Sequence, residues 1–172
     1  FKNMYGEPLH EKHIEDLSRY IDDNFQDIQN NLINSFKLLL EKSENKKGPI
    51  GFIILSVLRT SIMLNQSNCI LSAYDGNWYA DFEPIATDYD ADWVFQFYHS
   101  YLAKLHAERK KFVGKITFID VESFAVTKLE DYKLFLVAML RKSIDKIMEV
   151  IKESKIKKDD FFNIRIGEFI DI

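Results

Sequence analysis

The chain is poor in cysteine, glycine and proline: its 172 residues include 1 Cys, 6 Gly and 3 Pro. Because a single cysteine, Cys69, cannot form an internal disulfide, the sequence excludes a small disulfide-stapled scaffold and favours a reducing, cytoplasmic location. Hydrophobic residues make up 47% of the chain, which excludes the collagen-like and disordered classes. We therefore expect a single soluble globular domain that spans residues 1–172.

The chain also lacks a long hydrophobic run. The longest one, residues 52–58, is interrupted by Ser56 and stopped by Arg59, whereas a membrane-spanning helix needs about 20 apolar residues. Acidic residues outnumber basic ones by 27 to 23, so the chain as a whole should repel nucleic acid and anionic membrane surfaces. Only a local basic face could reverse this repulsion. We expect no nucleic-acid partner and no membrane association.

Charge is nevertheless segregated along the chain. Residues 74–92 contain six acidic residues and no Lys or Arg, whereas residues 104–158 contain 14 basic and 8 acidic residues. In one interpretation the two segments face water or each other. In the other, the second segment forms a basic face for an acidic partner. The aromatic residues among the basic ones fit core positions better than base-stacking platforms, so nucleic acid is a poor candidate for that partner.

No motif in the sequence names a reaction. Glycine-rich phosphate loops, nucleophile elbows and Cys-x-x-Cys pairs are all missing, so we predict no catalytic residue and no cofactor. His10 and His13 could face one metal ion from a helical turn, but the zinc-protease pattern has its histidines four apart, and we interpret them as surface histidines. Asp88, Asp90 and Asp92 alternate as in a calcium loop that lacks its glycine and distal glutamate, so caps and turns explain them better. We expect no metal site.

Apolar residues three and four apart predict a long amphipathic helix over residues 8–43. A helix of that length spans about 54 Å, which exceeds the diameter of roughly 40 Å of a domain of this size. Two arrangements would resolve the conflict. The helix breaks at Asp22-Asp23-Asn24, because these residues favour caps over helix interiors, or it stays unbroken and helps to build a dimer.

The hydrophobic period changes after Gly48-Pro49, which ends the helical region. Three short runs of β type follow, and Asp75-Gly76 between the last two is the favoured turn of a type I′ hairpin. These runs are residues 50–63, 68–74 and 77–82. They predict a three-stranded antiparallel meander over residues 50–83. A buried helix over residues 51–64 is the alternative.

The rest of the chain adds two helices and a strand. We predict helices at 91–113 and 128–153 and a closing strand at 161–170. An acidic loop over 83–92 precedes the first helix, and Thr127-Lys128-Leu129-Glu130 has the capping-box form that begins the second. Residues 115–126 fit a strand and a helix equally and stay unassigned. The predicted fold class is α+β, with long helices packed on one face of a small, mainly antiparallel sheet.

The predicted hairpins gather polar side chains on one face of the meander. With Asp75-Gly76 as a turn, Ser72 lies opposite Tyr79, and the preceding hairpin places Arg59 opposite Tyr74. The resulting polar face consists of Arg59, Ser61, Ser72, Tyr74, Tyr79 and Asp81. A guanidinium, two phenols and a carboxylate could bind a small ligand or peptide. In the alternative interpretation, Arg59 pairs with a nearby acid and the tyrosines lie over the sheet edge. The face depends on register, since a slip of one residue exchanges the two faces.

Two functions from different classes follow. We expect a non-enzymatic protein-interaction or regulatory module that binds a protein partner or associates with itself, because no acid and base are paired at catalytic spacing. The alternative is a small-ligand-binding or enzymatic domain that uses the polar face around Arg59, Tyr74, Tyr79 and Asp81. An interaction module should expose a broad apolar patch, whereas a ligand site should be a concave pocket with shifted pKa values.

Overall fold

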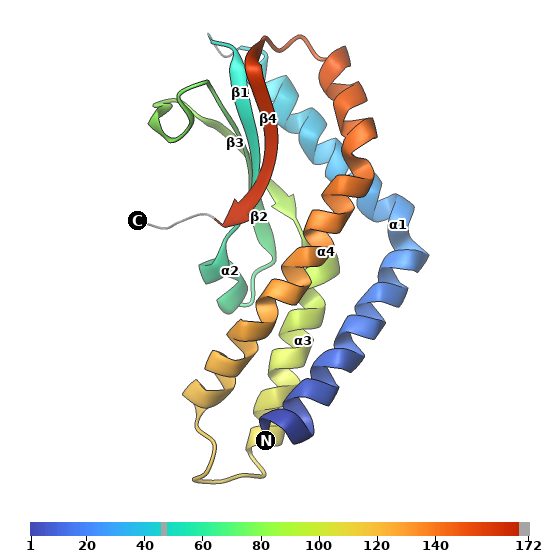
Figure 1. Ribbon diagram of the computed structural model, residues 1–172, viewed down its shortest axis with the longest axis vertical. Coiled ribbons are helices and arrows are strands. Elements are labelled where there is room, and N and C mark those ends of the chain that lie inside the picture. The colour runs from blue at the N-terminus through green and yellow to red at the C-terminus, as the bar shows by residue number, and fades with distance from the viewer. Residues whose placement is uncertain (46–47, 169–172) are drawn as a thin grey trace. The chain divides into compact units, whose positions relative to one another are not determined.

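The computed structural model describes residues 1–45 and 48–168, and the contacts within it divide the chain into two compact units. The helical unit comprises residues 1–25 with 92–138, and the sheet unit comprises residues 26–91 with 139–172. Two long helices, α1 (Glu7–Ser43) and α4 (Phe118–Glu153), each contribute one segment to each unit (Figure 1).

Helix α1 confirms the predicted long N-terminal helix and the predicted break. Asn24 has non-helical backbone angles (φ −118°, ψ 15°) in the middle of α1. Its side-chain amide donates to the carbonyl oxygen of Tyr20 at 2.8 Å. A short polar side chain that bonds to the backbone of the preceding turn competes with the helical hydrogen bonds and bends the helix. The alternative of an unbroken helix is therefore wrong.

The helical unit also contains the π-helix η1 (Lys2–Gly6) and helix α3 (Asp92–Arg109), which ends before the predicted position 113. Helix α4 begins at Phe118 rather than at 128, so most of the unassigned segment is helical. Thr117 and Asp120 form the capping pair: the hydroxyl of Thr117 accepts the Asp120 amide at 3.1 Å, and the Asp120 carboxylate accepts the Thr117 amide at 2.8 Å. The capping box predicted at Thr127 lies inside the helix.

The sheet unit contains a four-stranded mixed sheet in the order β3-β2-β1-β4. Its strands are β1 (Ile50–Val57), β2 (Asn68–Tyr74), β3 (Ile85–Asp90) and β4 (Lys158–Glu168). The pairs β1–β2 and β2–β3 are antiparallel, whereas β4 lies parallel to β1. The α+β class is confirmed, and the parallel strand makes the sheet mixed. Residues 169–170 of the predicted closing strand lie outside the described part of the chain.

One face of this sheet is the apolar core of the unit. Its fully buried side chains on β1 and β2 are Ile53, Leu55, Val57, Cys69, Leu71 and Ala73. Lys42 of α1 donates to the hydroxyl of Thr87 on β3 at 3.4 Å, and Thr87 pairs with Leu71, so the end of α1 lies over this face. Phe36 of α1 and Ile147 of α4 add buried side chains to the unit.

The predicted antiparallel pairing of the first two strands is confirmed, but the end of the first strand and the whole third strand are wrong. The first strand ends at Val57 and is followed by the short helix α2 (Arg59–Met63), in which only Ile62 is buried, so the alternative of a buried helix over residues 51–64 is wrong as well. Residues 77–82, predicted as a strand, contain the 3-10 helix η2 (Trp78–Ala80) instead. Asp75 accepts the amide of Asn77 at 2.8 Å, a local turn that replaces the predicted hairpin.

The third strand is β3, within the segment predicted as an acidic loop over 83–92. Ile85, Thr87 and Tyr89 pair with the core-facing residues of β2, while Asp88 and Asp90 are exposed on the other face. The alternation of acids therefore comes from the two-residue period of an edge strand, where charged side chains also discourage pairing with another chain. Asp88 and Asp90 therefore lie in a strand rather than in the predicted loop.

Candidate functional site

The residues of the predicted polar face do not lie opposite one another. Tyr74 pairs with Phe52 rather than Arg59, and Ser72 pairs with Ile54 and Ala86, so the predicted register is wrong. Ser72 and Tyr74 do share a sheet face, but both are buried.

The other members of the predicted face lie on separate elements. Arg59 is exposed at the start of α2, and Ser61 is half-buried in the same helix. The carboxylate of Asp81 accepts the amides of Asp75 and Glu83, each at 2.9 Å, which shows that it builds a turn. The side chain of Tyr79 lies outside the described part of the structure. Ligand binding by this set stays a prediction.

A cluster of two aromatic rings and an arginine lies on the sheet face that Ser72 and Tyr74 share. The rings of Phe52 and Trp78 stack at 4.8 Å with an angle of 23° between their planes. The guanidinium of Arg165 on β4 lies 4.1 Å from the Trp78 ring and 5.2 Å from the Phe52 ring. Such stacking orders a cation by attraction to the ring faces. Sequence reasoning could not find this cluster because it needs the long-range parallel pairing of β4 with β1.

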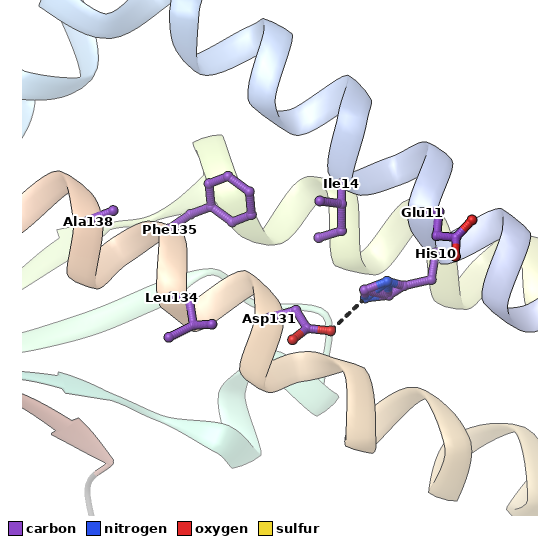
Figure 2. A pocket seen from close by; sticks show the side chains of 7 residues that line it. All are labelled: His10, Glu11, Ile14, Asp131, Leu134, Phe135 and Ala138. Carbon is purple, nitrogen blue, oxygen red and sulfur yellow. Dashed lines mark ion pairs between the residues drawn. The ribbon is translucent and has the colours of Figure 1, made fainter.

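The helical unit contains a better-formed candidate site, a groove of about 490 Å³ between α1 and α4 (Figure 2). Its lining residues are His10, Glu11 and Ile14 of α1 and Asp131, Leu134, Phe135 and Ala138 of α4. On each helix these positions are three or four apart or adjacent, so each set forms one stripe on its helix surface. Leu134 is 62% exposed although it is a large apolar side chain. We call this hollow the His10 groove.

The polar part of the His10 groove is a histidine that faces a carboxylate. The Nε2 atom of His10 lies 3.2 Å from Oδ2 of Asp131, and the two side chains point toward one another in Figure 2. The two atoms lack hydrogen-bond alignment, so Nε2 has no hydrogen-bond partner among the described residues. His10 is only 5% exposed, whereas the Asp131 side chain is about half exposed.

Burial lowers the pKa of His10, and the positive charge of Lys128 lowers it further, while the nearby carboxylates of Asp131 and Glu7 oppose the shift in part. Two tyrosine rings, Tyr101 and Tyr132, meet the imidazole edge-on at 5.5 and 5.6 Å and contribute to its desolvation. The groove therefore presents a neutral imidazole beside the Asp131 side chain near neutral pH.

His13 lies one turn further along α1 and is also buried. Its Nδ1–H donates to the carbonyl oxygen of Leu9 at 2.8 Å, and Nε2 accepts from Lys104 at 3.2 Å. Burial is the main cause that lowers the pKa of His13. The interpretation of His10 and His13 as surface histidines is wrong, since both belong to the interior of the helical unit. Among the described residues, no three His, Cys, Asp or Glu side chains gather to hold a metal ion.

Three fully buried tyrosines, Tyr98, Tyr101 and Tyr132, lie in the helical unit, and the last two contact the ring of His10. Tyr101 donates to the carbonyl oxygen of Gly6 at 3.4 Å, whereas the Tyr132 hydroxyl has no partner among the described residues. Burial raises the pKa of both of these phenols, so they stay protonated. Tyr101 and Tyr132 therefore supply no anionic nucleophile beside His10.

The single cysteine offers no reactive group either. Cys69 is fully buried on β2, and desolvation raises the pKa of its thiol to about 12. A thiol that stays protonated is a poor nucleophile.

None of the described helices is long and apolar enough to cross a membrane. Comparison with family models, with curated proteins and with solved structures found no match to this chain.

Proposed function

We propose that the protein is a non-enzymatic interaction module that binds a partner segment in the His10 groove. The segment presents an apolar side chain next to a Lys or Arg. The observation that supports this proposal is a groove of about 490 Å³ whose lining combines apolar side chains with a histidine and two carboxylates and contains no Lys or Arg. Grooves between helices are a recurrent docking site for amphipathic helices in other proteins.

The apolar part of the lining determines the preference for an apolar side chain of the partner segment. Ile14, Leu134, Phe135 and Ala138 supply most of the surface of the groove. Burying such surface against an apolar side chain contributes about 25 cal/mol per Å² removed from water. Exposed apolar surface beside a hollow is typical of a site that another molecule covers.

The carboxylates of the groove determine the preference for a Lys or Arg of the partner segment. Glu11 and Asp131 both line the groove, and the neighbouring His10 is neutral near pH 7 because burial lowers its pKa. A cation next to the apolar group gains from both carboxylates, whereas an anion is repelled by them. Phe135 adds an aromatic ring that can attract a cation.

Three probes with the same apolar body and different charge test this preference. They are 3-phenylpropylammonium, 3-phenylpropanol and 3-phenylpropanoate, titrated into protein with labelled Ile and Leu methyl groups. We expect shifts at Ile14 and Leu134, with the ammonium binding roughly tenfold tighter than the carboxylate, since each partly exposed ion pair contributes about 0.5–1 kcal/mol. Equal binding of all three probes, or shifts away from the groove, would contradict the proposal.

A steric variant provides the control. Ala138→Trp fills the groove from α4 and should abolish binding of the ammonium probe. Ala103→Trp makes the same change at an exposed position of α3 outside the groove, and should leave binding unchanged. If the two variants bind alike, the groove is not the site. A second copy of this chain is the other candidate occupant of the groove. It would appear as a dimer of the unmodified chain that Ala138→Trp dissociates.

We also place this module in the cytoplasm. Its one cysteine is a buried free thiol rather than half of a disulfide, which is the usual state in a reducing compartment.

A further inference from the structure

A second surface lies at the end of the helical unit, where a loop joins α3 to α4 (Figure 1). We call residues 109–119 the basic tip. This segment contains Arg109, Lys110, Lys111 and Lys115 and no acidic residue, so its local charge is +4 in a chain whose net charge is −4. The basic tip is therefore a local basic face on a chain that is acidic as a whole.

The basic tip also exposes large apolar side chains. Val113 is 88% exposed and Ile119 is 72% exposed, with Phe118 more than half exposed beside them in the sequence. Gly114, with a φ of +73°, lets the loop turn directly after Val113. Apolar side chains at the outermost positions of a basic loop are the combination that enters the interface of a membrane.

Contacts within the helical unit hold the tip in this arrangement. The Phe112 ring packs edge-on against Phe1 and Tyr5, at 5.6 Å in each case. The Phe118 ring stacks on His106 at 4.5 Å. Phe112 therefore anchors the loop on its inner side while the neighbouring Val113 points outward.

The basic charges of the tip are largely uncompensated. Lys111 pairs with Glu108 at 2.7 Å, but Lys110 and Lys115 have no ion pair among the described residues. Basic residues close to an anionic bilayer each contribute about fivefold to binding, and apolar insertion adds to this attraction. An anionic surface therefore matches both features of the tip.

We propose that the basic tip docks the helical unit on an anionic phospholipid surface, with Val113 and Ile119 entering the interface and Lys110 and Lys115 binding headgroup phosphates. This is peripheral docking and requires no membrane-spanning helix. It is independent of the His10 groove, because the two surfaces share no residue.

A fluorescent label at the tip tests the proposal directly. Cys69 is fully buried, so Val113→Cys provides one accessible thiol for an environment-sensitive fluorophore such as NBD. We expect a blue-shifted, brighter emission with phosphatidylcholine vesicles that contain phosphatidylserine, no change with phosphatidylcholine alone, and reversal by high salt, which screens the charges. The same label on Leu64→Cys, an exposed apolar position in the sheet unit, should not respond.

Charge-reversal variants test whether vesicle binding depends on the lysines of the basic tip or on the overall charge of the protein. In vesicle co-sedimentation, the double variant Lys110→Glu, Lys115→Glu should weaken binding at least tenfold, an expectation based on about fivefold for each lost cation. Lys155→Glu, a similarly exposed lysine in the sheet unit, should leave binding unchanged. Equal loss in both proteins would overturn the proposal. Absence of vesicle binding by the unmodified chain would also overturn it, and would leave an acidic protein as the partner of the tip.

Discussion

A buried amide of the sheet unit and a buried imidazole of the helical unit differ in their hydrogen bonding. In the sheet unit, Gln29 donates to Ser143 at 3.3 Å and accepts from Lys146 at 2.6 Å, so a buried amide is satisfied on both sides. In the helical unit, Nε2 of His10 and the hydroxyl of Tyr132 are buried without a hydrogen-bond partner among the described residues. A buried polar group without a partner costs stability, and in native proteins it often marks a functional site.

All four histidines of the chain, at positions 10, 13, 99 and 106, also lie in the helical unit. The sheet unit instead buries Ile, Leu, Val and Phe side chains around β1 and β2. The comparison suggests a division of roles, in which the sheet unit supplies stability and the helical unit supplies the binding surface. The predictions below test this division in order of expected effect.

The largest effect is expected in the sheet unit. Phe36→Ala removes a fully buried ring, and it should lower the free energy of unfolding by about 3–5 kcal/mol because a cavity remains where the ring was. Urea denaturation followed by circular dichroism measures this loss. A loss smaller than that of an exposed substitution such as Leu38→Ala would show that the sheet unit is not the stable part.

The next effect is a pH dependence confined to the helical unit. Burial lowers the pKa of His10 and His13 in the folded state, while the unfolded chain titrates near pH 6.5. The stability that the neutral imidazoles preserve is therefore complete above about pH 6.5, and it is lost as the pH falls toward the lower folded values. We expect a loss of about 1 kcal/mol between pH 6.5 and 5.5.

Hydrogen exchange at the two pH values locates that loss. Amides of the helical unit should lose protection, whereas those of β1 and β2 should lose much less. In the double variant His10→Gln, His13→Gln the difference between the units should disappear. Equal loss of protection in both units, or an unchanged slope in the double variant, would refute the role of these histidines.

The smallest effect distinguishes two buried tyrosines of the helical unit. Tyr132→Phe removes a hydroxyl that has no hydrogen-bond partner, and should raise the free energy of unfolding by about 1 kcal/mol. Tyr101→Phe makes the same chemical change but breaks the 3.4 Å bond to Gly6, and should lower it by about 0.5–1 kcal/mol. Thermal melts of the two variants give the order, and the reverse order would show that the Tyr132 hydroxyl is satisfied in solution.

Features with a local signal could be predicted from the sequence. The spacing of apolar residues located α1, and the run of Asp and Asn residues located its break at Asn24, because both depend on neighbouring turns. The start of α4 was missed although its signal was also local. Thr117 and Asp120 form a capping box with Asp in the place of Glu. The more usual form at Thr127 led to a predicted helix start ten residues too late.

Features that depend on distant pairing could not be predicted. The register of β1 and β2 is set by which face the helices cover and by the parallel pairing with β4, and neither has a local signal. The stripe of the groove on α1 was not predicted either, because His10 was interpreted as a surface histidine although it is buried. The facing stripe on α4 comes from a distant part of the chain, so the groove itself needed the structure.

The charge preference of the His10 groove is the central claim, and a pair of double variants tests it most directly. Binding of 3-phenylpropylammonium and 3-phenylpropanoate is measured in Glu11→Gln, Asp131→Asn and in the control Glu15→Gln, Asp16→Asn. The control makes the same change in net charge at two acids of α1 that pair with Arg19 and do not line the groove. We predict that the roughly tenfold preference for the ammonium persists in the control and vanishes in the groove variant. A preference that survives the loss of Glu11 and Asp131, or that is missing from the unmodified protein, would contradict the account.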